Sequence, residues 1–205
     1  MIGAHGAQRA SRNPLRRFVR HAVFAGAIAA LGIVAPIGQA STADAITTVD
    51  RPWYTVEQYY LGLANCTRTG GWVLSDGTCR GYGSGRYSAY VTPFRYSPGI
   101  SDRVSRPYAK LLAVKALCTH YANGGPGDRL IRSGYWHTTW GENIGCRDGY
   151  FTAKAAVLAS HLAMQAERST NGGHWRNLKN RSYGWIGIGV WRYYSRTRLV
   201  TDFYG

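Results

Sequence analysis

Apolar and polar positions alternate at helical spacing in three stretches of the chain beyond residue 50. Each stretch places apolar side chains three or four residues apart, and each is followed by glycine-rich sequence that stops a helix. The third stretch is apolar on most of its sides, which predicts a well-buried helix. The predicted helices cover residues 55–69, 105–122 and 152–167.

The end of the chain changes to the two-residue period of a strand. From Ile186 onward, larger side chains alternate with glycines through residues 185–191, and residues 198–204 form a suitable partner strand. Residues 71–104 are rich in glycine, serine and tyrosine without a sustained period, which predicts loops and short extended pieces. Helices followed by a hairpin predict an α+β layered fold.

The first 40 residues differ from this pattern. Five arginines precede an apolar run over residues 22–37, and small residues close it at Ala40. This order predicts a secretory signal peptide over 1–40, cleaved after Ala40 or Ala45. A transmembrane anchor is the alternative, but the run is shorter than a bilayer requires. Arg16-Arg17 leaves a twin-arginine signal open. Residues 41–52 are predicted as a linker and 53–205 as one domain.

Removal of the signal peptide leaves a strongly basic secreted chain. The full chain has a net charge of +15, and the segment carries five of its basic residues and no acidic ones, so a net charge of about +10 remains. The basic residues are scattered, which argues against specific nucleic-acid binding. We expect an extracellular monomer without a membrane anchor, and an unknown ligand that is anionic or cell-wall material.

All four cysteines lie beyond the signal peptide, at positions 66, 79, 118 and 146. An even number in an exported chain implies two disulfides, and three pairings are possible. We favour Cys66–Cys79 and Cys118–Cys146, because each bond closes a loop near the start of a motif described below. A four-cysteine zinc site is disfavoured, because no C-x-x-C pair is present.

Glutamate and histidine are scarce in the secreted part, which narrows the candidates for chemistry. It holds three glutamates and four histidines. Glu142 lies within glycine-rich sequence, and Glu167 precedes His174 by seven residues across another glycine pair. A histidine beside a carboxylate can hold a divalent metal or move a proton at neutral pH.

Four motifs in order resemble the CAP superfamily, whose members include cysteine-rich secretory proteins, antigen 5 and pathogenesis-related proteins. The segment 141–145, Gly-Glu-Asn-Ile-Gly, with Arg129 and Trp140 ahead of it, resembles the GENI block of that family. The other three motifs are a helix ending at His120, the bacterial-style block 172–178 and the closing strand 187–190.

The resemblance implies a three-layer α-β-α sandwich with a central, mainly antiparallel sheet and one large cleft. Residue by residue, it places His120, Glu142 and His174 in that cleft, with Asn143 fixing a loop. Glu167 is the least specific match, because its spacing to His174 is shorter than in many eukaryotic members. The eukaryotic string after the second histidine is absent here, which puts sterol and fatty-acid binding in doubt.

Three functions are compatible with these residues. The first is an extracellular module that binds a ligand or a divalent cation, with zinc at His120 and His174. The second is a metal-dependent hydrolase in which Glu142 or Glu167 takes a proton from bound water. The third is a cell-wall or glycan-binding module, suggested by seven tryptophans and fifteen tyrosines. No G-x-S-x-G elbow is present for a serine nucleophile.

Overall fold

The computed structural model describes residues 51–136 and 139–205, which lie within one compact unit. The predicted signal peptide over 1–40 and nearly all of the predicted linker lie outside the described residues. Every helix in the described part is too short or too polar to cross a membrane.

A four-stranded sheet forms the centre of the domain, in the order β3-β5-β6-β4. β4 and β5 each pair antiparallel with β6, and the short β3 runs parallel to β5, so the sheet is mainly antiparallel as predicted. A separate small sheet joins β1 to β2. The strands are β1 (Trp72–Val73), β2 (Cys79–Arg80), β3 (Arg95–Tyr96), β4 (Trp140–Asp148), β5 (Trp185–Tyr193) and β6 (Arg196–Tyr204).

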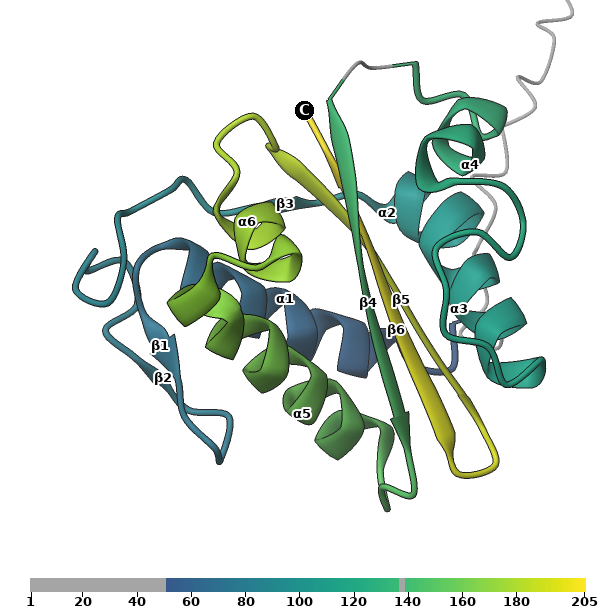
Figure 1. Ribbon diagram of the computed structural model, residues 1–205, viewed down its shortest axis with the longest axis horizontal. Coiled ribbons are helices and arrows are strands. Elements are labelled where there is room, and N and C mark those ends of the chain that lie inside the picture. Colours follow the sequence, from purple (N-terminus) through teal and green to yellow (C-terminus); the bar gives the residue numbers. More distant parts are fainter. Residues whose placement is uncertain (1–50, 137–138) are drawn as a thin grey trace, which may run out of the picture. The chain divides into compact units, whose positions relative to one another are not determined.

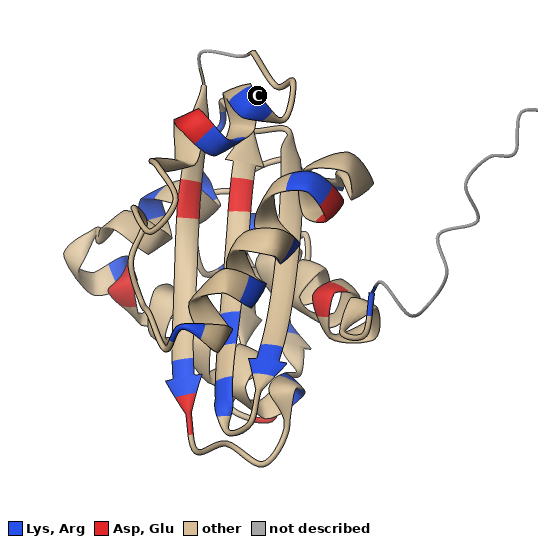
Figure 2. Cartoon of the chain, turned by 90° about the vertical axis from the view of Figure 1, so that its right-hand side faces the viewer, with Lys and Arg blue, Asp and Glu red and all other residues tan. Residues whose placement is uncertain are grey.

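Helices cover both faces of the sheet, which confirms the three-layer α-β-α sandwich (Figure 1). One layer contains α1 (Tyr54–Arg68), α5 (Ala153–Ala166), the 3-10 turn η3 (Glu167–Thr170) and α6 (Gly173–Lys179). The other contains α2 (Pro98–Ile100), the π-helical turn η2 (Ser101–Ser105), α3 (Arg106–Val114) and α4 (Pro126–Arg132). Seen from this second layer, basic positions are spread over strands and helices alike (Figure 2).

The alternation along β5 explains how both layers pack against the sheet. Ile186, Ile188 and Val190 are buried in the core shared with α1 and α5. The glycines between them face the other layer, where a Cβ on Gly187 would lie 2.3 Å from a methyl of Ile100. A Cβ on Gly189 would lie 2.2 Å from the backbone of η2. Glycine therefore allows a helix to lie directly on the strand.

A buried ion pair joins α1 to α3 and uses the third glutamate of the secreted part. Arg106 donates two hydrogen bonds to the Glu57 carboxylate, at 2.9 and 2.6 Å, and the Val190 amide donates a third at 3.2 Å. Glu57 is fully buried. Because each charge is paired and hydrogen-bonded, Glu57 has a structural role.

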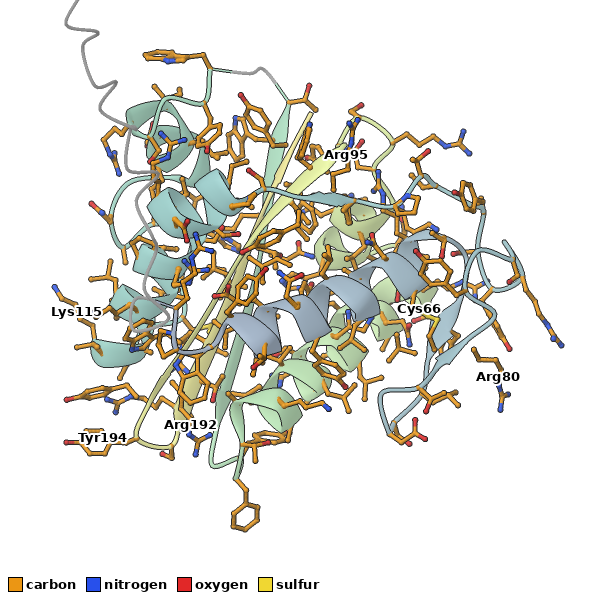
Figure 3. All side chains as sticks on the ribbon, turned by 180° about the vertical axis from the view of Figure 1, so that it is seen from behind. Cys66, Arg80, Arg95, Lys115, Arg192 and Tyr194 are labelled. Carbon is orange, nitrogen blue, oxygen red and sulfur yellow. A yellow bond between two sulfur atoms is a disulfide. The ribbon has the colours of Figure 1, made fainter. Side chains whose placement is uncertain are left out.

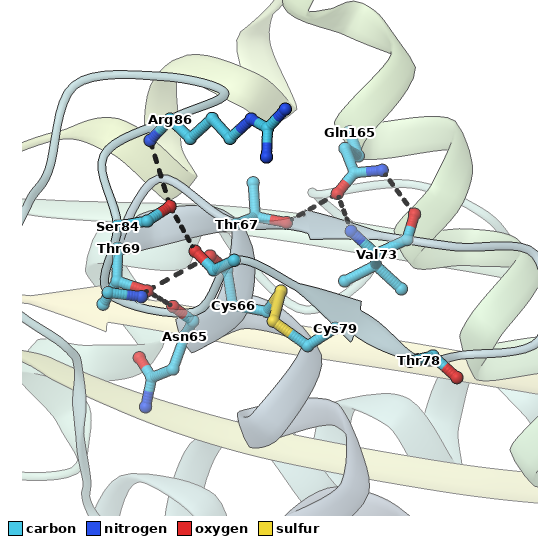
Figure 4. The surroundings of a disulfide bond; sticks show 12 residues. Asn65, Cys66, Thr67, Thr69, Val73, Thr78, Cys79, Ser84, Arg86 and Gln165 are labelled. Carbon is cyan, nitrogen blue, oxygen red and sulfur yellow. Dashed lines mark hydrogen bonds between the residues drawn. A yellow bond between two sulfur atoms is a disulfide. The ribbon is translucent and has the colours of Figure 1, made fainter.

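Both favoured disulfides are present. The Cys66–Cys79 disulfide connects α1 to the small β1–β2 sheet (Figures 3 and 4). At this sheet, the Gln165 side chain accepts a hydrogen bond from the Val73 amide and donates one to the Val73 carbonyl. Cys118–Cys146 connects the loop after α3 to β4. The described part contains no free cysteine.

Several local predictions were wrong. The second helix ends at Val114, so Cys118 and His120 lie in the loop that follows, where Ala116 adopts a positive φ of 54° that breaks the helix. Segment 141–145 is part of strand β4, although its glycines suggested a loop. Helices α4 and α6 were not predicted. The third helix buries only one face, and it exposes Lys154 and several alanines.

Candidate functional site

The first histidine–glutamate pair lies between the loop after α3 and the edge strand β4. His120 Nδ1 is 2.6 Å from Glu142 Oε1, and Arg129 of α4 pairs with the other carboxylate oxygen. Arg129 also donates to the His120 carbonyl at 2.9 Å, so a single guanidinium fixes the loop and the carboxylate together. The Glu142 side chain is 1% exposed, while that of His120 is 40% exposed.

A second carboxyl group lies beside Glu142, on the neighbouring strand. Asp202 of β6 is directly opposite Glu142 in the strand register, so two acidic positions adjoin in the sheet (Figure 2). Ser105 donates a 2.6 Å hydrogen bond to Asp202 Oδ2. Burial, together with the charge of Glu142, raises the pKa of Asp202 to about 8. Asp202 is therefore protonated at neutral pH, and Glu142 with Arg129 carries the ionic contact.

The other histidine–glutamate pair lies at the turn between α5 and α6. His174 Nδ1 is 2.5 Å from Glu167 Oε1, and the His174 amide donates to Oε2 at 2.9 Å. Asn171, in the left-handed conformation, and Gly172 make the tight turn that brings these residues together. Burial alone would raise the pKa of Glu167, but its hydrogen bond and charge interaction with His174 lower it overall. The Glu167 side chain is 31% exposed.

The structure brings the four predicted residues together as two pairs that line different hollows. His120 and Glu142 line a hollow of about 430 Å³, and Glu167 and His174 line another of about 180 Å³. The first is also lined by Tyr121, Trp140, Asn177 and Tyr183, and the second by Cys118, Ile144, Cys146 and Met164.

Two asparagines connect the pairs. Asn143, which follows Glu142 on β4, donates to the His174 carbonyl at 3.1 Å. Asn177 of α6 donates to the Glu142 carbonyl at 3.1 Å and to the Asn143 side-chain oxygen at 2.8 Å. Asn143 thus fixes an edge strand against α6, whereas the resemblance implied that it fixes a loop.

The arrangement does not fit one metal ion held by all four residues. Both oxygens of Glu142 and both oxygens of Glu167 already accept hydrogen bonds from protein groups. Over residues 51–136 and 139–205, no three histidine, cysteine, aspartate or glutamate side chains are placed to hold one ion. Divalent-metal binding at His120 and His174 stays a prediction.

A further histidine has a structural environment. His161 of α5 is fully buried, and its Nε2 is 2.9 Å from Thr67 Oγ1. Thr67 gives its hydroxyl proton to Gln165, so His161 Nε2 carries the proton in this bond. Burial lowers the pKa of His161 to about 3, which keeps the ring neutral.

No role was predicted from the sequence for Asp202, Asn177 or Arg129. The sequence did point to Arg129, because this residue occurs in the motif that resembles the GENI block. Asp202 gave no signal beyond its acidic character, because its place beside Glu142 depends on the register between β4 and β6.

Comparison with known proteins bears on the fold. No family model and no curated protein matches this chain by sequence. An extracellular protein containing an SCP domain from Bacillus anthracis str. Ames superposes with a TM-score of 0.50 at 19% identity. The match covers 73% of this chain and 40% of that protein, so this chain spans less than half of its length. NaASP2 with Zn²⁺ superposes with a TM-score of 0.46 at 16% identity, covering 72% and 78% of the two chains.

The likeness to the SCP domain agrees with two independent features of this chain. The motifs that resemble the CAP superfamily occur in that family's order, and the three-layer sandwich is the architecture that the resemblance implied. The described residues therefore form a domain with the fold of that SCP domain.

Proposed function

We propose that this protein is exported and acts outside the cell as a ligand-binding domain. Two disulfides within the domain suit an oxidising compartment. The sequence pattern of residues 1–40 is that of a secretory signal. The similar SCP-domain protein from Bacillus anthracis is itself described as extracellular.

The hollow beside His120 and Glu142 is the best candidate for the ligand site, and one observation carries this choice. Tyr121 and Trp140 line the hollow while 74% and 42% exposed, next to the polar groups of His120 and Asn177. Exposed aromatic faces beside a few fixed polar groups are typical of a binding site. This combination also suits the flat apolar faces and hydroxyls of a sugar, so it favours a glycan as the ligand.

Binding is better supported than the hydrolase alternative. A general base needs a carboxylate oxygen within reach of a water proton. Both Glu142 oxygens are occupied by His120 and Arg129, and both Glu167 oxygens are occupied by His174. Metal-dependent hydrolysis is therefore the weaker proposal, because every oxygen of both glutamates already accepts a hydrogen bond within the protein and keeps only its second acceptor position for a water proton.

The test is binding to insoluble glycans, including purified peptidoglycan and chitin, measured by depletion of protein from solution. Replacement of Tyr121 or Trp140 by alanine should weaken binding about tenfold, because each loses a stacking surface. Tyr194→Ala is the matched control, since Tyr194 is 79% exposed and does not line this hollow. Equal binding by all variants, or none by the unchanged protein, would refute the glycan proposal.

A further inference from the structure

A buried arginine without a carboxylate partner lies at the end of α1. Arg68 is 1% exposed, and no carboxylate pairs with it in the part of the chain that the structure describes. Its guanidinium instead donates to backbone carbonyls of Thr92 at 2.5 Å, Leu178 at 2.9 Å, Asn180 at 3.0 Å and Tyr183 at 2.5 Å. The hydrogen bonds are satisfied, but the positive charge is not neutralised.

Other cations surround Arg68. Lys179 donates to the carbonyls of Arg68 and Ala89, at 2.7 and 2.6 Å, and it also has no carboxylate partner among the described residues. Burial, followed by the charges of Arg68, Arg168 and Arg181, lowers the pKa of Lys179 to about 8. Several positive charges are therefore close enough to repel one another, and an anion placed among them would relieve that repulsion.

Two of these cations, Arg68 and Arg181, line a hollow of about 290 Å³ beside β3 and the start of β5. Arg68, Arg95 and Arg181 line it, and no aspartate or glutamate is among the described residues around it. Arg95 and Arg181 are exposed. The Arg95 guanidinium lies 4.6 Å from the ring centroid of Trp185, which orients it without using its hydrogen-bond donors.

We propose that this hollow binds a multiply charged oxyanion of the phosphate type. Arg95 and Arg181 would donate hydrogen bonds to its oxygens, since guanidinium groups match the geometry of phosphate. Arg68 would supply a fixed positive charge beneath them. Such a group occurs as free phosphate and within phosphate-bearing polymers outside cells. The proposal does not depend on the aromatic hollow, although Tyr183 lines both hollows.

The experiment compares two double variants that lose the same charge. Arg95→Gln with Arg181→Gln removes the two exposed guanidinium groups of the hollow. Arg80→Gln with Lys115→Gln is the control, because both side chains are exposed and lie far from Arg95 (Figure 3). Inorganic phosphate is titrated at constant ionic strength, and binding is followed by calorimetry and by the rise in Tm. A second arm measures retention on immobilised polyphosphate.

We expect the unchanged protein and the control to bind phosphate, and the Arg95/Arg181 variant to bind at least tenfold more weakly. Retention on polyphosphate alone, lost only in the Arg95/Arg181 variant, would support the hollow and assign the anion to a polymer. Equal weakening in both double variants would show general charge attraction and overturn the proposal, as would absence of binding in both arms. The glycan test uses other residues, so each proposal can fail alone.

Discussion

The two histidine–glutamate pairs have almost the same contact and very different surroundings. The nitrogen–oxygen distance is 2.6 Å between His120 and Glu142 and 2.5 Å between His174 and Glu167. The Glu142 side chain is 1% exposed and shares its charge with Arg129, whereas Glu167 is 31% exposed and contacts its own turn. Equal contacts therefore do not imply equal roles: the first glutamate joins three elements, and the second closes one turn.

The difference follows from where each glutamate lies along the chain. Glu142 occurs within a strand, so its neighbours come from distant segments: the loop of His120, α4 and β6. Glu167 and His174 are separated by seven residues, and a glycine turn is enough to bring them together. The first pair should thus depend on the whole fold, and the second mainly on local structure.

The largest expected effect is on stability. Glu142→Ala would leave the Arg129 guanidinium, which belongs to a residue only 5% exposed, without its carboxylate. Breaking a buried ion pair from one side costs about 3–5 kcal/mol. Glu167→Ala should cost at most about 1 kcal/mol, because its pair is partly exposed to solvent. Denaturant unfolding of both variants measures the difference, and equal losses would contradict the contrast between the pairs.

An effect that is smaller per pH unit should appear in the dependence of stability on pH. The pKa of Asp202 is raised from 3.8 to about 8 by burial and by Glu142, so the folded domain keeps a proton that the unfolded chain releases. Stability contributed by this group is complete below pH 3.8 and is lost as pH rises towards 8. Asp202→Asn cannot titrate, and it should remove a slope on the order of 1 kcal/mol per pH unit.

Glu167→Gln is the control for this measurement. The pKa of Glu167 is lowered from 4.5, so its contribution is present above that value and is lost only in more acidic solution. Between pH 7 and 8, above the usual pKa of both a glutamate and a histidine, its profile should run parallel to that of the unchanged protein. If the dependence of stability on pH were also unchanged in Asp202→Asn, this would show that Asp202 does not hold a proton beside Glu142.

Much of the fold was predictable because local rules and packing agree. The alternation from Ile186 to Val190 predicted β5, and the glycine stop after α1 predicted its end. β4 was missed because Gly141 and Gly145 resemble loop residues. These glycines are needed for packing, since a Cβ on Gly145 would lie 2.5 Å from Ser160 and one on Gly141 would lie 2.7 Å from the Tyr183 hydroxyl. Tertiary contact thus outweighed local propensity.

The site was predictable in part, for the same physical reason. The scarcity of glutamate and histidine narrowed the candidates to Glu142, Glu167 and His174, and the resemblance added His120. The bridge that Asn143 and Asn177 form between β4 and α6 could not be predicted, because its hydrogen bonds join residues more than 30 positions apart in the sequence. The position of Asp202 could not be predicted either, because a shift of one residue in the register between β4 and β6 would turn its side chain to the other face of the sheet.

The smallest expected effect concerns zinc, and it tests whether the pairs act separately. The pairs line different hollows, so each histidine should bind Zn²⁺ weakly by itself, raising stability by less than about 1 kcal/mol. Thermal unfolding with added Zn²⁺ should show a partial loss of this rise in His120→Ala and in His174→Ala. The double variant should show the sum, because independent sites add. If either single variant lost the whole Zn²⁺-induced rise in stability, both histidines would have to share one ion. The two hollows would then have to open into one.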